Sequence, residues 1–328
     1  MLQFLLNDPV GAFLSATPIV KFNLIVMVLF GVIFFYQIVF FFIGIVKGEY
    51  RYPKAKTLHH YAYFIAAHNE EAVIANLVRS IKQQDYPQEL IDVFVVADAC
   101  TDETARAARE AGAIVYERND LARKGKSWVM DYGFERILRE YPGVHEGFFI
   151  FDADNLISPE YTRIMNDAFD QGYMAVTSYR NSKNFGSSWI SAAYATAFLR
   201  EARFLNYPRM KLHTNCAISG TGFLVSSKLI EENGGWPYHL LTEDIQFSTV
   251  CATKGWRIGY CDDAILYDEQ PVTFSQSWRQ RMRWAKGFYQ VNAHCGMPLL
   301  RGCLRGPIRF SCYDMLMTIA PGMLLTIV

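Results

Sequence analysis

An uncharged stretch of 23 residues, Leu24 to Val46, constrains this chain more than any other feature of its sequence. As an α-helix it extends about 34 Å at 1.5 Å per residue, which exceeds a hydrocarbon core of about 30 Å. A buried core helix rarely stays apolar on every face over such a length, and a cleaved signal peptide has a shorter apolar run nearer the start of the chain. The sequence therefore predicts a transmembrane helix over residues 22–46.

Basic residues flank this stretch unequally. Upstream the only cation is Lys21. Four cations follow shortly after the stretch: Lys47, Arg51, Lys54 and Lys56. The positive-inside rule assigns residues 1–21 to an extracytoplasmic segment, and the basic linker 47–56 with the rest of the chain to the cytosolic side. We therefore expect an integral protein of the cell membrane, in contact with membrane lipids, whose main domain faces the cytosol.

The last part of the sequence is apolar again. After Asp314, residues 315–328 carry no charge, but they are too few for an ordinary span. We interpret residues 313–328 as the start of a second membrane segment or as a segment along the interface. Before it, three leucines mix with three arginines, which is typical of a segment on an anionic membrane surface or of a solvated loop. These residues are Leu299, Leu300, Leu304, Arg301, Arg305 and Arg309.

Composition excludes several other classes of protein. Hydrophobic residues make up 51% of the chain, which is too much apolar surface for a disordered protein. Basic and acidic residues are balanced at 32 each, whereas a nucleic-acid-binding protein needs a basic surplus. The seven cysteines are scattered without any C-x-x-C pair, so we expect reduced thiols rather than a disulfide framework or a zinc module.

Short apolar runs alternate with helical patterns in the middle of the chain. The predicted strands cover Tyr61–Ala67, Asp92–Ala97, Ala113–Tyr116 and Gly147–Phe151. The predicted helices cover Ala72–Gln84, Thr101–Ala111 and Lys126–Glu140. This alternation predicts an α/β domain with a mostly parallel sheet and helices on both faces. In such sheets, ligands bind beyond the carboxyl ends of the strands.

Carboxylates follow three of the predicted strands. Glu70 comes after the first strand, Asp98 after the second, and Asp152 with Asp154 after the fourth. Acidic residues near helix starts often only stabilise the helix dipole, and Asp102 fits that structural interpretation better. Two carboxylates one residue apart at the end of a strand suit a hard divalent cation, which would neutralise a diphosphate leaving group.

Cations and a second acidic pair lie further along the chain. Lys124 and Lys126 flank a glycine at the start of a predicted helix, whose amide groups also suit an anion, although solvated surface lysines fit equally. Thr242, Glu243 and Asp244 precede an apolar-periodic stretch, where an ordinary helix N-terminus is the simpler interpretation. Beside a metal-bound diphosphate, Asp244 is instead a candidate general base.

A further cluster lies within a predicted helix near the end of this region. Gln280, Arg283 and Trp284 are spaced as i, i+3 and i+4, so they share one helix face. A sugar ring can stack on the indole while the guanidinium meets a phosphate. A core tryptophan beside a surface arginine is the structural alternative.

The ordered motifs AAHNEE, VADACTDETA, KGK, DAD, SGTGF, LTED and QRMRW together resemble the family 2 inverting glycosyltransferases. In particular, the chain resembles the membrane-embedded group that includes cellulose, chitin, hyaluronan and poly-N-acetylglucosamine synthases. The similarity covers about residues 57–290 and, in outline, the membrane segments. The resemblance implies a GT-A fold and a nucleotide-diphosphate sugar as donor.

The resemblance also implies a role for each acidic motif. Glu70 and Asp98 would belong to the nucleoside pocket, with Lys126 and Asp152 also contacting the nucleotide sugar. Together with the diphosphate, Asp152 and Asp154 would hold Mg²⁺ or Mn²⁺. In the T-E-D triplet, Asp244 would be the general base, and Glu243 is the other expected catalytic residue.

The remaining motifs imply an acceptor side. Gln280, Arg283 and Trp284 would form the Q-x-x-R-W element near the acceptor and the diphosphate, and residues 219–223 match a loop lining the acceptor side. The sequence departs from the family at the nucleotide motif, which more often reads D-D-G-S and here keeps only Asp98 as a carboxylate. Processive members also carry several membrane helices after Q-x-x-R-W, and this sequence ends inside the first.

We accordingly expect a cytosolic glycosyltransferase domain over residues 57–275, followed by Q-x-x-R-W and interfacial helices over 276–312. The expected reaction is inverting transfer of a hexose or N-acetylhexosamine, from UDP-N-acetylglucosamine or UDP-glucose by resemblance, to a glycan or lipid-linked acceptor in polysaccharide synthesis. Transfer of one sugar to a lipid carrier and a non-catalytic subunit of a synthase complex are the alternatives. A nucleotidyltransferase also uses paired carboxylates but has no need for Q-x-x-R-W.

Overall fold

The computed structural model describes residues 9–46, 48 and 50–320, and the chain divides into two compact units, Met1–Val46 and Lys47–Val328. The described part of the first unit forms the helices α2 (Pro9–Ser15), α3 (Pro18–Phe34) and α4 (Tyr36–Ile45). Thr17 begins α3, because its hydroxyl accepts a hydrogen bond from the Val20 N–H and a proline follows it.

Helices α3 and α4 cover the stretch predicted to form a transmembrane helix. Among the described residues, no single helix combines the length and apolar composition of a membrane span, so the predicted continuous helix over 22–46 is not confirmed. The two helices pass that test only as a pair bent by 52°. At the break, the Phe35 N–H donates to the Val32 carbonyl and the Ile38 N–H to the Phe35 carbonyl, so both bonds span three residues instead of the α-helical four.

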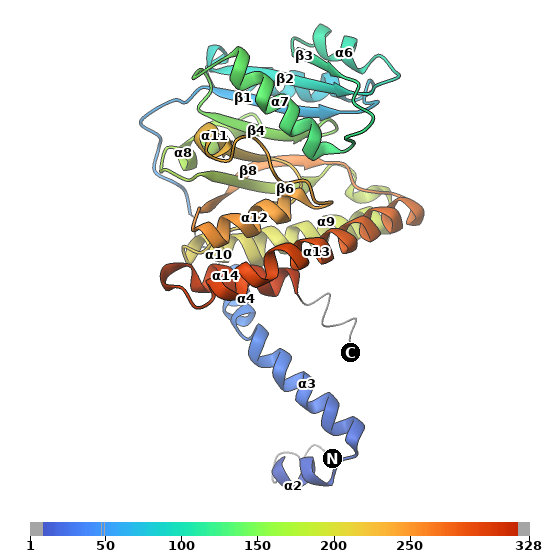
Figure 1. Ribbon diagram of the computed structural model, residues 1–328, viewed down its shortest axis with the longest axis vertical. Helices are drawn as coiled ribbons and strands as arrows, with labels where there is room; N and C mark the ends of the chain where they lie inside the picture. Colours follow the sequence, from blue (N-terminus) through green and yellow to red (C-terminus); the bar gives the residue numbers. More distant parts are fainter. Residues whose placement is uncertain (1–8, 47, 49, 321–328) are drawn as a thin grey trace. The chain divides into compact units, whose positions relative to one another are not determined.

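An eight-stranded sheet forms the centre of the second unit, in the order β3-β2-β1-β4-β7-β6-β8-β5 (Figure 1). The strands are β1 (Tyr61–Ala67), β2 (Ile91–Asp98), β3 (Ile114–Arg118), β4 (Gly147–Asp152), β5 (Leu156–Ile157), β6 (Ala175–Ser182), β7 (Phe223–Ser226) and β8 (Ile258–Asp268). The first half, from β3 to β4, is parallel as predicted.

The second half of the sheet is mixed, which corrects the prediction of a mostly parallel sheet. β7 runs antiparallel to both β4 and β6, and β5 runs antiparallel to β8. The reason is the entry point of β7: its first residue, Phe223, pairs with Ile150 near the carboxyl end of β4. The loop before β7 therefore lies at the same edge as the carboxyl ends of the parallel strands.

Helices cover both faces of the sheet, as predicted. On one face, α5 (Ile74–Lys82), α6 (Thr104–Glu110) and α8 (Tyr161–Phe169) share one apolar core with β1, β2 and β4. On the other face lies α7 (Lys126–Glu140), where Phe134 packs against Phe64 and Phe148. The short helix α11 (Ser227–Glu232) contacts β4 and β7. α6 begins three residues later than predicted, because the Asp102 carboxylate accepts from the Thr104 N–H and hydroxyl in the preceding turn.

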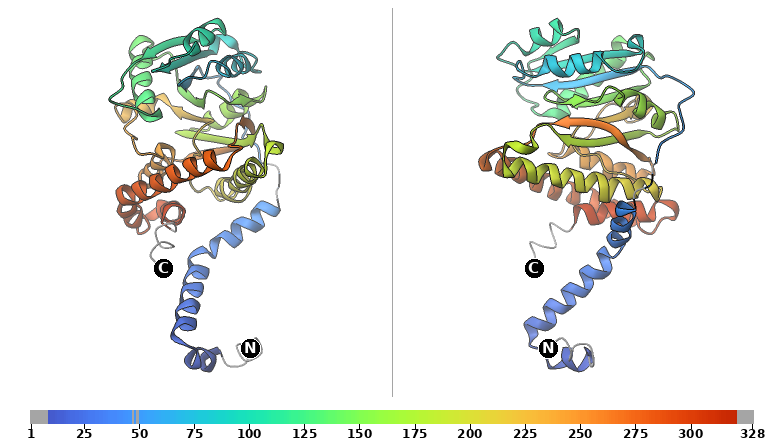
Figure 2. Two further views of the ribbon diagram at one scale, coloured as in Figure 1. Left: turned by 90° about the vertical axis from the view of Figure 1, so that its right-hand side faces the viewer. Right: turned by 180° about the vertical axis from the view of Figure 1, so that it is seen from behind.

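A layer of helices lies along the β6 and β8 side of the sheet (Figures 1 and 2). Its members are α9 (Trp189–Glu201), α10 (Tyr207–Lys211), α12 (Glu243–Lys254), α13 (Phe274–Gly302) and α14 (Arg309–Ile319). Buried side chains of α12, α13 and α14 form a second apolar core, and a buried ion pair joins Arg209 to Asp314 at 2.6 Å. Residues 313–319, expected to begin a second membrane segment, thus belong to α14 and pack in this layer, while residues 321–328 lie outside the described part of the chain.

Candidate active site

The parallel strands bring the predicted carboxylates to one edge of the sheet. β1 pairs in register with both neighbours, Ala67 opposite Ala97 and Ala66 opposite Asp152. Glu70, Asp98 and Asp152 therefore leave the sheet at its common carboxyl edge. Burial raises the pKa of Glu70, and the negative charges of Asp152 and Asp102 raise it further, which indicates that these carboxylates lie near one another.

Asp98 is paired with a cation that the sequence analysis did not identify. Its Oδ1 accepts from Arg118 Nη1 at 2.5 Å, and β2 and β3 place the two residues directly opposite each other. The Arg118 side chain is only 5% exposed and also donates to the Arg123 carbonyl at 2.6 Å. Asp98 is thus held rigidly at the edge of the sheet, with the adjacent His68 ring bonded to its carbonyl oxygen at 2.6 Å.

The predicted D-x-D turn is held by neighbouring polar side chains. The Asp152 N–H donates to Thr221 Oγ1 at 2.9 Å and to Asn155 Oδ1 at 3.2 Å. Lys126 Nζ donates to Asp152 Oδ1 and to the Gly220 carbonyl at 2.8 Å. This lysine is the first residue of α7, so the predicted cation reaches the predicted carboxylate across the edge of the sheet.

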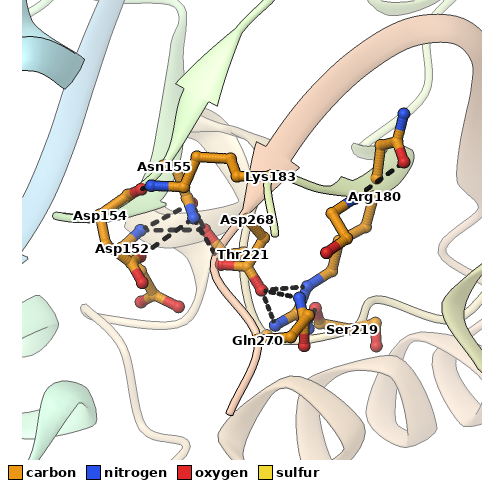
Figure 3. Close-up of polar contacts among 12 residues, drawn as sticks. Asp152, Asp154, Asn155, Arg180, Lys183, Ser219, Thr221, Asp268 and Gln270 are labelled. Atoms are coloured by element: carbon orange, nitrogen blue, oxygen red, sulfur yellow. Dashed lines mark hydrogen bonds and ion pairs between the residues drawn. The ribbon is translucent and has the colours of Figure 1, made fainter. Parts of the chain in front are cut away.

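Asp268 connects the D-x-D turn to the loop before β7, and Figure 3 shows this connection. One of its carboxylate oxygens accepts from Asn155 at 2.7 Å, and the other from Arg180 at 2.5 and 3.0 Å and from Gln270 at 2.7 Å. Arg180 also donates to the Ser219 carbonyl at 3.0 Å. Asp268 is buried, so the network fixes the D-x-D turn and the loop relative to each other.

Gly220 lies between two functional side chains. Its φ of +79° is one that residues other than glycine rarely adopt. A Cβ at this position would lie 3.5 Å from Arg180 Nη1 and 4.0 Å from Asp244 Oδ2. Because Lys126 bonds to both Asp152 and the Gly220 carbonyl, the T-E-D and D-x-D motifs both lie next to this loop.

Burial keeps several of these carboxyl groups weakly acidic. It raises the pKa of Asp244, whereas the Ile245 N–H and the positive charge of Lys126 lower it. The pKa of Glu243 rises to about 7, chiefly through burial and then through the charge of Asp244. Asp154 also reaches a pKa of about 7, through burial and then the charges of Asp268 and Asp152. The Asp152–Asp154 pair fits Mg²⁺ or Mn²⁺, because crowded carboxylates gain from a shared divalent charge.

Parts of the Q-x-x-R-W element connect to the site only indirectly. Trp284 packs between Tyr194 and Phe198 of α9, and the Arg180 guanidinium lies 3.9 Å from the Phe198 ring. Gln280 Oε1 is buried and has no hydrogen-bond partner among the described residues. Arg283 is exposed on α13 and forms no ion pair within the part of the chain that the structure describes.

Sequence reasoning missed the residues that support the predicted carboxylates. They are Arg118, Asn155, Arg180, Lys183 and Asp268, with Lys183 Nζ bonded to the Asp154 carbonyl. Arg118, Arg180 and Asp268 each lie at or near the end of a strand, and a charged residue in that position was the available signal. Predicted Lys124 is exposed, and the Asp102 carboxylate accepts hydrogen bonds from Thr104, the first residue of α6.

The family model described as "Glycosyltransferase like family 2" matches residues 59–287, more than half of the chain. The probable glycosyltransferase YdaM of Bacillus subtilis is 28% identical over 71% of this chain and 56% of its own length. A beta-monoglucosyldiacylglycerol synthase of Synechocystis is 26% identical over 69% of this chain and 47% of its own. A poly-beta-1,6-N-acetyl-D-glucosamine synthase of Staphylococcus aureus is 23% identical over 70% of this chain and 54% of its own length.

The chain therefore spans about half the length of the curated relatives it matches. Two solved structures share its fold. The mannosyltransferase PcManGT of Pyrobaculum calidifontis, solved with GDP-Man and Mn²⁺, superposes with a TM-score of 0.61 at 18% identity over 92% of this chain and 89% of its own. Residues 1–349 of Staphylococcus aureus TarS, solved with UDP-GlcNAc, superpose with a TM-score of 0.55 at 15% identity. The superposition covers 81% of this chain and 73% of the TarS chain. The second unit thus has a GT-A-like α/β fold.

Proposed function

The chain belongs to the glycosyltransferase-like family 2, and we propose that it transfers a hexose or N-acetylhexosamine from a nucleotide-diphosphate sugar to an acceptor hydroxyl with inversion. One observation carries this proposal. Lys126 bonds to both Asp152 and the Gly220 carbonyl, and Asp244 lies next to Gly220, close enough for its charge to act on that of Lys126. A base and a diphosphate-binding edge are thereby set close together, as a direct displacement requires.

In the proposed reaction, Asp244 Oδ2 takes the proton of the acceptor hydroxyl. The acceptor oxygen forms a bond to the anomeric carbon while the bond from that carbon to the diphosphate oxygen breaks. Because burial raises the pKa of Asp244, the carboxylate is a stronger base than an exposed aspartate. Inversion follows from this single displacement, which needs no covalent enzyme intermediate.

The departing diphosphate carries negative charge, and the site holds cations beside it. Lys126 is bonded to Asp152, and Arg180 is fixed by Asp268, so both are positioned before the substrate binds. Asp152 and Asp154 would hold Mg²⁺ or Mn²⁺, which when bound supplies charge neutralisation to the diphosphate. Glu70 and Asp98, at the ends of β1 and β2, are assigned to the nucleoside.

A UDP-sugar, UDP-N-acetylglucosamine or UDP-glucose, is the proposed donor, and a glycan in polysaccharide synthesis is the proposed acceptor. The polysaccharide synthase among the relatives supports this choice. A lipid acceptor that receives a single sugar is the second candidate, which the glucolipid synthase among the relatives favours. We assign the reaction to the cytosolic face of a membrane, with Gln280, Arg283 and Trp284 near the acceptor.

The substitution Asp244→Asn tests the assignment of the base. We expect sugar transfer to fall by at least a factor of about 10³, because asparagine does not take the acceptor proton that is assigned to Asp244. Donor binding should change by less than about threefold, since the metal and nucleoside residues are untouched. Radiolabelled donor measures transfer and separates lipid-extractable product from polymer, while calorimetry measures binding. Asp263→Asn, at an exposed carboxylate of β8, is the control. Normal turnover in Asp244→Asn would remove this residue from the mechanism.

A further inference from the structure

A second group of metal-ligating side chains lies at the opposite edge of the sheet from the candidate active site. It consists of His60, Asp92 and His145. His60 directly precedes β1, Asp92 is the second residue of β2, and His145 lies two residues before β4. Because these three strands are adjacent and parallel, the group is at their common amino end. The seven residues of β1 separate it from the D-x-D edge by about 20 Å.

The three side chains direct their ligand atoms to one point. Both imidazoles approach the same carboxylate oxygen, with His60 Nε2 at 3.0 Å and His145 Nε2 at 2.9 Å from Asp92 Oδ2. All three ligand atoms lie within 4.8 Å of one another. In a tetrahedral site with bonds of 2.0–2.1 Å, ligand atoms are about 3.3 Å apart. Shifts of no more than about 1 Å therefore convert the hydrogen-bonded cluster into a coordination site.

Packing already orients the least exposed ligand. The rings of Phe94, Tyr141 and Phe148 surround His145, with centroid distances of 5.5, 5.8 and 6.3 Å, and its side chain is only 1% exposed. His60 and Asp92 remain 22% and 34% exposed, which gives an ion access from solvent. Asp92 forms ion pairs with no lysine or arginine among the described residues, so its charge is available to a cation.

We propose that His60, Asp92 and His145 bind one zinc-type divalent cation that joins the amino ends of β1, β2 and β4. Two imidazole nitrogens and one carboxylate oxygen form a ligand set typical of Zn²⁺, whereas Mg²⁺ prefers oxygen ligands alone. Each imidazole presents Nε2 to the cation when its proton is on Nδ1. With three protein ligands, the fourth position is left for water.

This site is separate from the cation assigned to Asp152 and Asp154, and its cation is expected to stabilise the fold by joining three strands. A cation that binds only the folded chain stabilises it in proportion to RT ln(1 + [L]/Kd), so zinc should raise the melting temperature. The proposal does not depend on glycosyltransferase activity, and its failure would leave the proposed function unchanged.

Cobalt binding to the tag-free full chain is the test. Co²⁺ in a site with nitrogen and oxygen ligands gives visible absorption that Zn²⁺ removes by displacement. We expect the wild type to bind about one equivalent of zinc-displaceable Co²⁺. His60→Gln and Asp92→Asn should bind Co²⁺ at least tenfold more weakly. These two positions are part-exposed, so the variants should keep the wild-type circular dichroism spectrum.

Two controls separate this site from other cation binding. His59→Gln removes a neighbouring imidazole that bonds to Glu146 and Asp170, and it should keep the cobalt spectrum. The double variant Asp152→Asn/Asp154→Asn should keep it as well. The proposal is overturned if the wild type gives no zinc-displaceable absorption, if His60→Gln binds as tightly as the wild type, or if the double variant loses the signal.

Discussion

At the scale of single residues, the candidate site stores unfavourable electrostatic energy in its carboxylates. Glu243 and Asp244 are adjacent at the start of α12, and burial raises the pKa of both. A raised pKa means that the folded chain binds more protons than the unfolded chain between the two pKa values. Ionising these groups therefore costs folding free energy, which is a common property of catalytic sites.

Replacing Glu243 by glutamine should reveal this cost as a pH dependence. The pKa of Glu243 is about 7 in the folded chain against a usual value of 4.5, so the wild type loses stability as the pH rises through that interval. Glutamine does not ionise. We expect the free energy of unfolding of Glu243→Gln, relative to wild type, to increase by about 2–3 kcal/mol from pH 4.5 to 7 and then level off.

Urea unfolding in EDTA at several pH values measures this difference. Glu135→Gln is the matched control, because the Glu135 side chain is 76% exposed. Its ion pair with Arg139 is long, at 3.8 Å, and also exposed. Its stability difference from wild type should stay constant over the same range. A constant difference for Glu243→Gln as well would show that this carboxyl group ionises normally in the folded chain.

At the scale of elements, the parallel half of the sheet was predictable from hydrophobic patterns. The predicted limits of β1 and α7 match the structure, and those of β2 and β4 agree within one residue. Buried strands and amphipathic helices have distinct periodicities. The carboxyl ends of the predicted strands then locate the acidic motifs. Local sequence alone was enough to expect Asp98 and Asp152 at one edge.

The rest of the site depends on pairing between distant segments. Arg118 meets Asp98 only because β2 and β3 align in that register, and Asp268 meets Arg180 through the pairing of β6 with β8. Strand register and direction are set by tertiary packing, which a local pattern does not encode. For the same reason, the antiparallel entry of β7 was not predicted.

The loop before β7 can be tested for how precisely it must be placed beside the site residues. We expect Gly220→Ala to cost about 1 kcal/mol of stability through its positive φ, and to reduce transfer at least tenfold, because relief of that strain would shift the loop that accepts from Lys126 and Arg180. Gly172→Ala is the matched control: its φ of +85° is similar, but a Cβ there meets no atom within 4 Å. Transfer assays and urea unfolding of both variants provide the measurement. Equal activity in the two variants would contradict a close fit at Gly220.

At the scale of the whole molecule, helices α3 and α4 expose apolar side chains. Leu29 and Val32 of α3 are 52% and 71% exposed within the structure. We propose that this bent pair holds the chain at a membrane, with the glycosyltransferase domain on the cytosolic side.

Two lysines on α3 test this attachment. A charged residue at membrane depth costs about 2.5–3.5 kcal/mol, so Leu29→Lys/Val32→Lys should move much of the protein from the membrane fraction to the supernatant. Leu121→Lys, at a 67% exposed position in the second unit, should leave the distribution unchanged. Fractionation followed by immunoblotting measures the result. Retention of the double variant at the wild-type level would assign membrane attachment to another segment.

Asp152 and Asp154 are proposed to hold a cation that binds the diphosphate of the donor. Calorimetric titration with UDP, and in parallel with GDP, measures it directly in the wild type and in Asp152→Asn/Asp154→Asn, each with Mn²⁺ and with EDTA. We predict that one nucleotide binds the wild type at least tenfold more tightly with Mn²⁺, and that the double variant loses this difference. Equal nucleotide affinity of the wild type in EDTA and in Mn²⁺, or a Mn²⁺ dependence that persists in the double variant, would rule out a cation on these two residues.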